Sequence, residues 1–132
     1  MPKDLEVRVA FFGPNNRPIL LESDPVRLAR LYGGLRDAGI DVVAVTRIAD
    51  IEHWPSDTFM ITDIDHFTPW WREVGATSVI VLANTRAQGI AACQSGATTW
   101  LRHNCTARQL VAAIDSLLLS EKKVYEAAAT PR

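Results

Sequence analysis

Acidic residues follow two short apolar runs, and these acids are the side chains that could carry chemistry. One run is Phe59–Asp63, which ends on an acid. An apolar run of this length with no helical period is typical of a strand buried on both faces in the middle of a parallel sheet. Pro18–Leu21 is a second run, and Glu22 and Asp24 come after it. Because the crevice of an open α/β sheet lies at the carboxyl ends of its strands, we expect Asp63 to lie there with other polar residues near it.

Each of these acids also has a purely structural interpretation. Asp63 could be a solvated strand end or a helix cap, and Glu22 a surface acid in a loop. Asp24 precedes Pro25, which is the arrangement of a helix N-cap followed by proline at the first helical position.

The histidines and cysteines give weaker signals. Asp65 and His66 could pair with His103 around a metal ion, but no ligand spacing supports such a site. Cys93 and Cys105 lack a C-x-x-C or metal-like spacing, and we expect buried or inert thiols. No serine lies in a Gly-x-Ser-x-Gly elbow, so hydrolase chemistry has no support.

Strand-like and helix-like segments alternate along the chain, which predicts a parallel sheet with right-handed crossovers and helices on both faces. The predicted fold class is α/β, a three-layer sandwich with a doubly wound, five-stranded parallel sheet and a possible extra N-terminal strand. The predicted strands are 7–12, 18–21, 41–46, 59–63, 78–82 and 98–101, and the predicted helices are 25–38, 68–75, 87–94 and 106–119, with one or two turns at 48–53.

The composition is that of one ordinary globular domain. The chain has 132 residues, 48% apolar and 22% charged, and a net charge of −1, so charge gives no argument for nucleic acid or a membrane surface. No apolar run reaches about 18 residues, and the charged start predicts no signal peptide, so a cytoplasmic protein is expected. We predict an N-terminal extension or extra strand over 1–17, the domain over 18–120, and a tail or linker over 121–132.

Residues near the last strand carry a family resemblance. Gly96-Ala97 is followed, after two residues, by Trp100-Leu101 and then by a helix that Thr106 caps. Together with the strand-end acids, this pattern resembles the receiver (CheY-like) domain of bacterial two-component response regulators over 18–119. The spacing is most similar to the NarL-type subclass, whose receivers precede a LuxR-type DNA-binding domain. The resemblance implies a flavodoxin/CheY-like sheet with strand order 2-1-3-4-5.

The resemblance also assigns the family's site positions. The phosphoacceptor aspartate falls on Asp63. The acidic pair falls on Glu22 and Ser23, so the acid that ligates Mg²⁺ in the family is replaced by a serine. The switch hydroxyl falls on Ala83 and the lysine on His103.

These replacements weaken a phosphorylation site. Phosphoryl transfer depends on positioning and on cations that neutralise the developing charge. Glu22 and Asp63, with Asp24 beside them, would bind Mg²⁺ weakly, and no other cofactor is expected. His103 is shorter than lysine and mostly neutral at pH 7, and Ala83 has no hydroxyl. The chain is therefore expected to be a degenerate member, a pseudo-receiver in an atypical response regulator.

The surface that the family uses for signalling is expected to differ here as well. In the family, the fourth helix, fifth strand and fifth helix transmit the signal, usually by dimerising. The segment between Ala83 and Gly96 is short, which implies a remodelled face. Trp70 and Trp71 lie about 100° apart on a helix, so one is expected in the core and the other as an exposed interface anchor.

Three functions remain open. The first is a signalling module, not an enzyme, that regulates transcription or a partner protein through protein–protein contacts without normal phosphorylation. The second is a genuine phosphoacceptor, modified on Asp63 by a histidine kinase. The third and weaker one is a small-molecule sensor with a pocket at Ala83 and His103. A homodimer is expected, with no membrane contact and with DNA contacted only through a separate domain.

Overall fold

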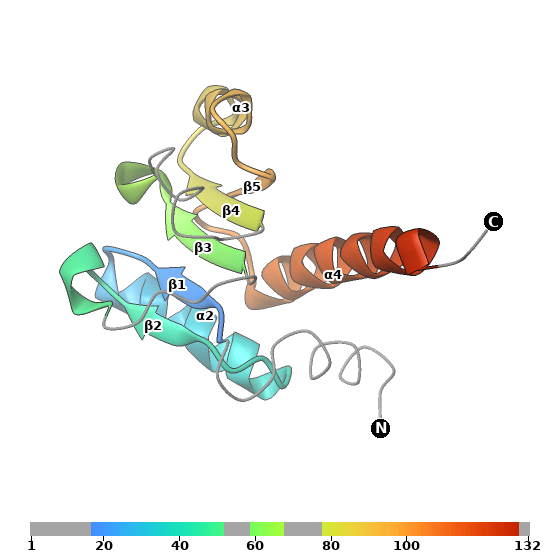
Figure 1. Ribbon diagram of the computed structural model, residues 1–132. Coiled ribbons are helices and arrows are strands. Elements are labelled where there is room, and N and C mark those ends of the chain that lie inside the picture. Colours follow the sequence, from blue (N-terminus) through green and yellow to red (C-terminus); the bar gives the residue numbers. More distant parts are fainter. Residues whose placement is uncertain (1–16, 52–58, 68–77, 130–132) are drawn as a thin grey trace.

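The computed structural model describes residues 17–51, 59–67 and 78–129, and within them the predicted fold class is confirmed. Five parallel strands form one sheet in the order β2-β1-β3-β4-β5 (Figure 1). This is the 2-1-3-4-5 order that the resemblance implied. The strands are β1 (Ile19–Leu21), β2 (Val43–Val45), β3 (Phe59–Asp63), β4 (Ser78–Ala83) and β5 (Thr99–Arg102).

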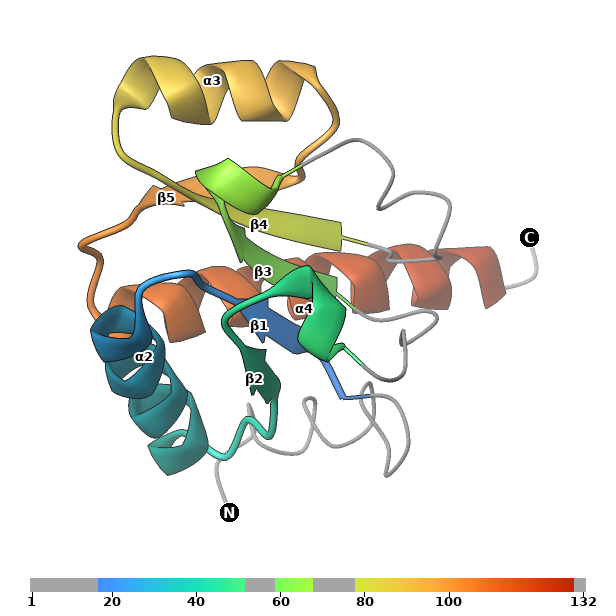
Figure 2. The same ribbon diagram turned by 90° about the vertical axis from the view of Figure 1, so that its left-hand side faces the viewer.

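Helices cover both faces of this sheet, which gives three layers (Figure 2). Helices α2 and α4 contact each other on one face, and α3 packs on the other face against β4 and β5. The helices are α2 (Pro25–Asp37), α3 (Arg86–Gln94) and α4 (Ala107–Ala129), and the short 3-10 turns are η1 (Ile48–Asp50) and η2 (Ile64–His66).

Successive residues of the strands belong to two separate cores, because side chains alternate between the faces of a sheet. Leu20 and Ile61 pack with Leu31 of α2 and Leu110 of α4 on one side. The neighbouring residues of the strands, such as Met60, pack on the opposite side with Ala92 of α3 and with residues of the two 3-10 turns. Every residue of β1, β3 and β4 is buried, as the unbroken apolar runs predicted.

Local signals fix where the helices begin. Asp24 caps α2 as predicted: its Oδ1 accepts from the backbone N–H of Val26 at 3.0 Å. Thr106 and Gln109 form a reciprocal capping box at the start of α4, with N–H to side-chain oxygen distances of 3.1 and 2.9 Å.

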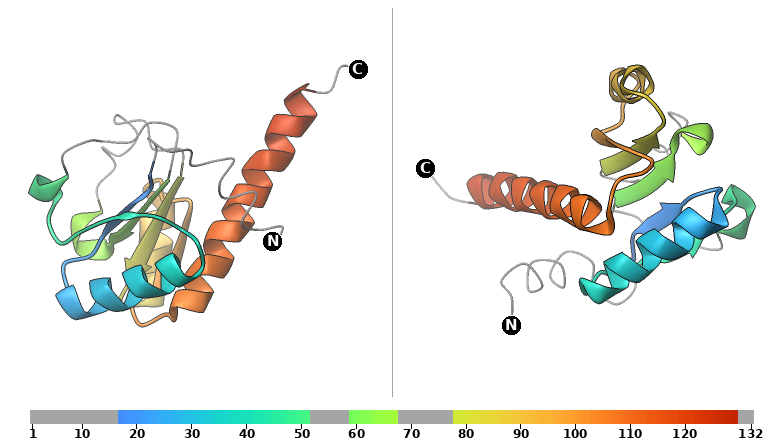
Figure 3. Two further views of the ribbon diagram at one scale, coloured as in Figure 1. Left: turned by 90° about the horizontal axis from the view of Figure 1, so that it is seen from below. Right: turned by 180° about the vertical axis from the view of Figure 1, so that it is seen from behind.

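The long last helix extends past the sheet. It continues beyond Leu119, where the sequence pattern ended, to Ala129, and its C-terminal half projects away from the strands (Figure 3). The segment 121–129, which the sequence assigned to a tail or linker, therefore continues this helix. The extra strand at 7–12, the helix at 68–75 and the tryptophans Trp70 and Trp71 lie outside the described residues.

Candidate functional site

The strand-end positions predicted from the sequence meet at one edge of the sheet. Leu21 pairs with Thr62 and Asp63 pairs with Leu82 in register, so Glu22, which follows β1, and Asp63, which ends β3, lie at the same end of neighbouring strands. Glu22 is completely buried and Asp63 is 3% exposed. Neither acid is the solvated surface residue that the structural interpretation allowed.

Both carboxylate oxygens of Asp63 accept hydrogen bonds from within the chain. Oδ2 accepts from the Ser23 backbone N–H at 2.9 Å and from the Ser23 hydroxyl at 2.6 Å. Oδ1 accepts from the His66 backbone N–H at 3.0 Å and lies 2.6 Å from His66 Nδ1. Because an ionised carboxylate can only accept, this contact requires the proton on Nδ1. Four donors therefore surround one carboxylate.

These donors decide the charge of Asp63. Burial is the largest single influence and would raise the pKa of the carboxyl group. The hydrogen bonds from the Ser23 side chain and backbone and from His66, together with the positive charge that His66 can carry, outweigh burial and lower the pKa below its ordinary value. Asp63 is thus an ionised, fully hydrogen-bonded group at neutral pH.

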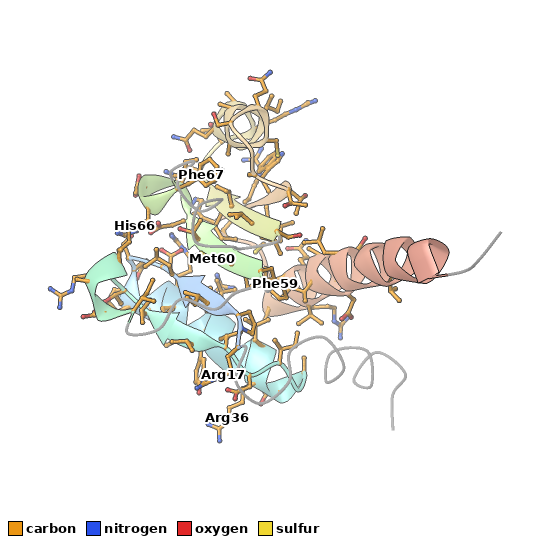
Figure 4. All side chains as sticks on the ribbon, in the orientation of Figure 1. Arg17, Arg36, Phe59, Met60, His66 and Phe67 are labelled. Atoms are coloured by element: carbon orange, nitrogen blue, oxygen red, sulfur yellow. The ribbon has the colours of Figure 1, made fainter. Side chains whose placement is uncertain are left out.

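The histidine in this arrangement belongs to the turn directly after β3. The Asp63 side chain caps η2 by accepting from the His66 N–H, and His66 Nδ1 reaches the same carboxylate. Figure 4 labels His66 on this turn. The sequence pointed to His66 only as a poorly supported metal ligand with His103. The spacing of three residues between Asp63 and His66 is the one local signal that could have indicated a capped turn.

Glu22 has a different environment from Asp63. Its Oε1 accepts from the Asp24 N–H at 3.1 Å and pairs with Arg27 Nη1 at 3.0 Å, whereas its Oε2 is buried with no partner among the described residues. Burial raises the pKa of this carboxyl group, and nearby Asp63 adds to the rise, although the Asp24 N–H and Arg27 counteract it. Glu22 is therefore a buried acid with one carboxyl oxygen that has no described hydrogen-bond partner.

We refer to Glu22, Ser23, Arg27, Asp63 and His66 as the Asp63 cluster. Asp24 lies at its margin: it caps α2, and its Oδ2 lies 3.8 Å from Arg27 Nη2. Arg27 thus links the two acids after β1 through side-chain contacts.

The remaining two positions of the predicted site lie together but make different contacts. The His103 N–H donates to the Ala83 carbonyl at 2.8 Å. Ala83 is fully buried, and His103 Nδ1 is buried with no partner among the described residues. In the described part of the chain, no hydrogen bond or ion pair joins His103 to Asp63. Thr85, the nearest hydroxyl after Ala83, caps α3 by accepting from Gln88 N–H at 3.2 Å.

The donor set does not fit Mg²⁺, the metal that the receiver fold implies. Mg²⁺ requires several oxygens in octahedral geometry. Asp63 already receives two donors on each oxygen, and only Oε2 of Glu22 is left over. Within the described residues, no group of three or more His, Cys, Asp or Glu side chains is arranged to hold a metal ion.

Neither cysteine belongs to the Asp63 cluster. Both cysteines are free thiols, Cys105 buried and Cys93 half-buried. None of the helices in the described segments is long and apolar enough to cross a membrane.

Solved structures of response-regulator receiver domains resemble this chain. A signal receiver domain from Vibrio parahaemolyticus matches with a TM-score of 0.66 and 19% identity, over 89% of this chain and 100% of its own. A response regulator receiver domain from Clostridium thermocellum matches with a TM-score of 0.68 and 20% identity, over 83% and 98%. A response regulator from Burkholderia pseudomallei, solved with a phosphorylated aspartic acid and a calcium ion, matches with a TM-score of 0.60 and 19% identity, over 89% and 76%.

These identities are low, so the likeness establishes the receiver fold alone. Comparison with protein-family models found no match, and comparison with curated proteins found none. The chain therefore shares the fold of these structures with little sequence similarity to them.

Proposed function

We propose that this chain is a receiver-like signalling domain that acts through protein–protein contacts and not through phosphorylation of Asp63. The observation that carries the proposal is the hydrogen bonding of Asp63. A carboxylate that accepts from Ser23 on one oxygen and from His66 on the other must lose donors before either oxygen can attack a phosphoryl group. The domain would then regulate a partner or transcription as part of an atypical response regulator in the cytoplasm.

The replaced residues support the same proposal. Ser23 donates a hydrogen bond at the position where the family has a Mg²⁺ ligand, so it stabilises the resting carboxylate in place of a metal. Ala83 offers no hydroxyl, and His103 has no described contact with Asp63. A loose, highly charged transition state would meet neither a metal nor a fixed lysine here.

A genuine phosphoacceptor is the second candidate, and one observation favours it. The lowered pKa keeps Asp63 ionised, as a nucleophile requires, and the residue stands at the carboxyl end of β3. A histidine kinase would then be the partner. The hydrogen bonds from Ser23 and His66 are evidence against this candidate, because they occupy the lone pairs of Asp63 that would attack a phosphoryl group.

The structure gives the small-molecule hypothesis less support. A groove of about 650 Å³ lies between β5 and α4, and its lining includes none of Asp63, Ala83 and His103. We therefore favour a protein partner over a metabolite bound near these positions.

Other features of the proposal follow the family resemblance. We propose no enzymatic activity for the domain itself and a NarL-like placement in which a separate domain would contact DNA. Self-association as a homodimer, with the predicted strand at 7–12 or an exposed tryptophan as a contact, belongs to this proposal too.

A titration with Mg²⁺ and beryllofluoride tests the phosphorylation-independent function. Amide signals of residues around Asp63, recorded by NMR, are expected to stay unchanged at millimolar metal. As a matched control, the double variant Ser23→Asp, His103→Lys restores two family side chains and is expected to bind more tightly than the natural sequence. A saturable shift in the natural sequence, centred on Asp63 and absent in Asp63→Asn, would overturn the proposal and establish the phosphoacceptor.

A further inference from the structure

A groove beside the edge of the sheet has no role in the Asp63 cluster. It has a volume of about 650 Å³ and runs between β5 and the first turns of α4. The buried Cys105 and the half-buried Leu101 line its apolar part, and Ala112 and Ala113 line the helix side. Since both helix residues are alanines, these two positions contribute no large side chain to the space between helix and strand. We call this space the β5–α4 groove.

The backbone beside the groove is also open. Strand β5 pairs with β4 on one side and, among the described strands, has no neighbour on the other. An edge strand presents unpaired N–H and C=O groups to which an extended segment can be added. The groove thus combines an apolar hollow with a strand edge, and these two features together suit a peptide.

Among the residues that line the groove the one charge is Arg102, and the nearest acid along α4 is Asp115, one turn after Ala112. No Asp or Glu occurs between Glu73 and Asp115, whereas Arg102 and Arg108 lie in this stretch. Arg102 lines the groove and ends β5. Arg108 precedes Ala112 by four residues, which places both on one side of α4.

These two arginines have no acid to pair with inside the described chain. Both are exposed, and the side chain of neither forms a hydrogen bond or ion pair with a described residue. By contrast, Arg17, Arg27 and Arg47 each pair with an acid at 3.0 to 3.4 Å. Arg108 is also the second residue of α4, where the helix dipole disfavours a cation.

This charge pattern decides between the possible occupants. A second copy of the chain in a two-fold dimer would bring two copies of this groove to one interface, and the groove lining has no acid to pair with Arg102. Nucleic acid is bound by several cations spaced along its phosphates, and an apolar hollow adds nothing to that contact. A segment that carries carboxylates and an apolar side chain satisfies both features.

We infer that the β5–α4 groove binds an extended acidic segment of a partner protein. Carboxylates of the segment pair with Arg102 and Arg108, and one of its apolar side chains enters the space beside Ala112 and Ala113. The inference rests on the proposed function, because it names the partner surface through which the domain would act. Any homodimer of the chain would then form through another surface.

Selection from a display library of random 12-residue peptides tests the inference on the whole 132-residue chain. The selection is made in EDTA, so no metal or phosphoryl mimic takes part. We expect the enriched peptides to contain several Asp or Glu residues together with Leu, Phe or Trp. Their affinity, measured by fluorescence anisotropy, is expected to fall at least about tenfold in Arg102→Glu and in Ala112→Trp, which fills the groove.

Arg36→Glu is the matched control, because it makes the same charge change at an exposed arginine near the end of α2, away from β5 (Figure 4). It is expected to change the affinity less than about twofold. Circular dichroism of each variant checks the fold, and Ala112→Trp, at an exposed helical position, does not depend on the charge reversal.

Several results would overturn the inference. The selection could enrich no peptide, or could enrich neutral or basic ones. Acidic peptides could bind Arg102→Glu as tightly as the natural sequence, or a 20-base-pair DNA duplex could bind in a way that depends on Arg102. A dimer seen by sedimentation and dissociated by Ala112→Trp would identify a second copy as the occupant and would also overturn it. Beryllofluoride binding at Asp63 would instead remove the proposed function, and the groove result would still stand.

Discussion

The Asp63 cluster lies at the carboxyl ends of β1 and β3 and the β5–α4 groove lies beside β5, and the two regions differ in how their charges are satisfied. In the cluster, Asp63 receives four hydrogen bonds from within the chain. At the groove, the side chains of Arg102 and Arg108 have no partner among the described residues. Charges satisfied internally contribute to folding, whereas exposed charges without partners are available to another molecule. The difference indicates that the charges of the Asp63 cluster serve the fold, whereas those at the groove are available to a partner.

The largest expected effect comes from Asp63→Asn. An amide nitrogen cannot accept hydrogen bonds, so it would face two donors of Ser23 or of His66. Because hydrogen bonds to a charged group contribute about 1.5 to 3 kcal/mol each, we expect a loss of about 2 kcal/mol in the free energy of unfolding at pH 7. Urea denaturation measures it, and the exposed Asp65→Asn is the control. A more stable Asp63→Asn variant would show that repulsion from Glu22 exceeds the hydrogen bonding.

The same carboxylate predicts an acid dependence of this difference. The pKa of Asp63 is lowered in the folded state, so the stability it contributes is present above the ordinary value of 3.8 and is lost as the pH falls through the folded value. The advantage of the natural sequence over Asp63→Asn should therefore persist at pH 5 and shrink only below about pH 4.

A somewhat smaller effect is expected for Ser23→Ala. This change removes the hydroxyl donor at 2.6 Å but leaves the backbone N–H in place. We expect a loss of about 1.5 kcal/mol and a rise in the pKa of Asp63, both measurable by urea denaturation and by NMR titration. Ser95→Ala, at an exposed residue after α3, is the control. An unchanged stability would mean that the Ser23 hydroxyl bonds water equally well, and the cluster would be less closed than the comparison requires.

The sequence predicted the scaffold of this comparison but not its contacts. Unbroken apolar runs in β1, β3 and β4 indicated buried parallel strands, and acids at their ends indicated one common edge. Ser23 was interpreted only as a missing metal ligand. Its hydrogen bond to Asp63 depends on how the loop after β1 meets the end of β3, and residues 40 positions apart leave no local pattern.

Sequence patterns could not predict the β5–α4 groove either. The short segment after Ala83 indicated a changed surface, and α3 does have only nine residues. The hollow itself, however, depends on Ala112 and Ala113 facing β5 across space. The absence of acids between Glu73 and Asp115 is visible in the sequence, but its meaning appears only when Arg102 and Arg108 are placed beside an edge strand.

Glu22 gives a test in which the direction matters more than the size. Burial raises the pKa of Glu22 in the folded state, so the folded chain binds this proton more tightly than the unfolded chain. Stability relative to Glu22→Gln should therefore increase as the pH falls from neutrality through the folded value toward the ordinary 4.5. Paired urea denaturation series of the two proteins measure this difference. A difference that stays constant over the range would mean that Arg27 compensates the buried charge fully, and Glu22 would then belong with the satisfied groups.

The smallest expected effect lies at the groove, and its smallness is informative. Arg108→Glu should leave the free energy of unfolding unchanged or raise it by about 0.5 kcal/mol, because an acid suits the first turn of α4 better than a cation does. Arg102→Gln should stay within about 0.5 kcal/mol, as for other surface substitutions without partners. Thermal and urea denaturation of the whole chain measure both.

A loss above about 1 kcal/mol for either variant would show that the arginine pairs with a part of the chain outside the described residues. The groove would then be satisfied internally, as the Asp63 cluster is, and the distinction between the two regions would fail. If these variants keep the free energy of unfolding of the natural sequence but lose peptide binding, the arginines contribute to recognition and not to folding. The groove and the Asp63 cluster would then have different functions.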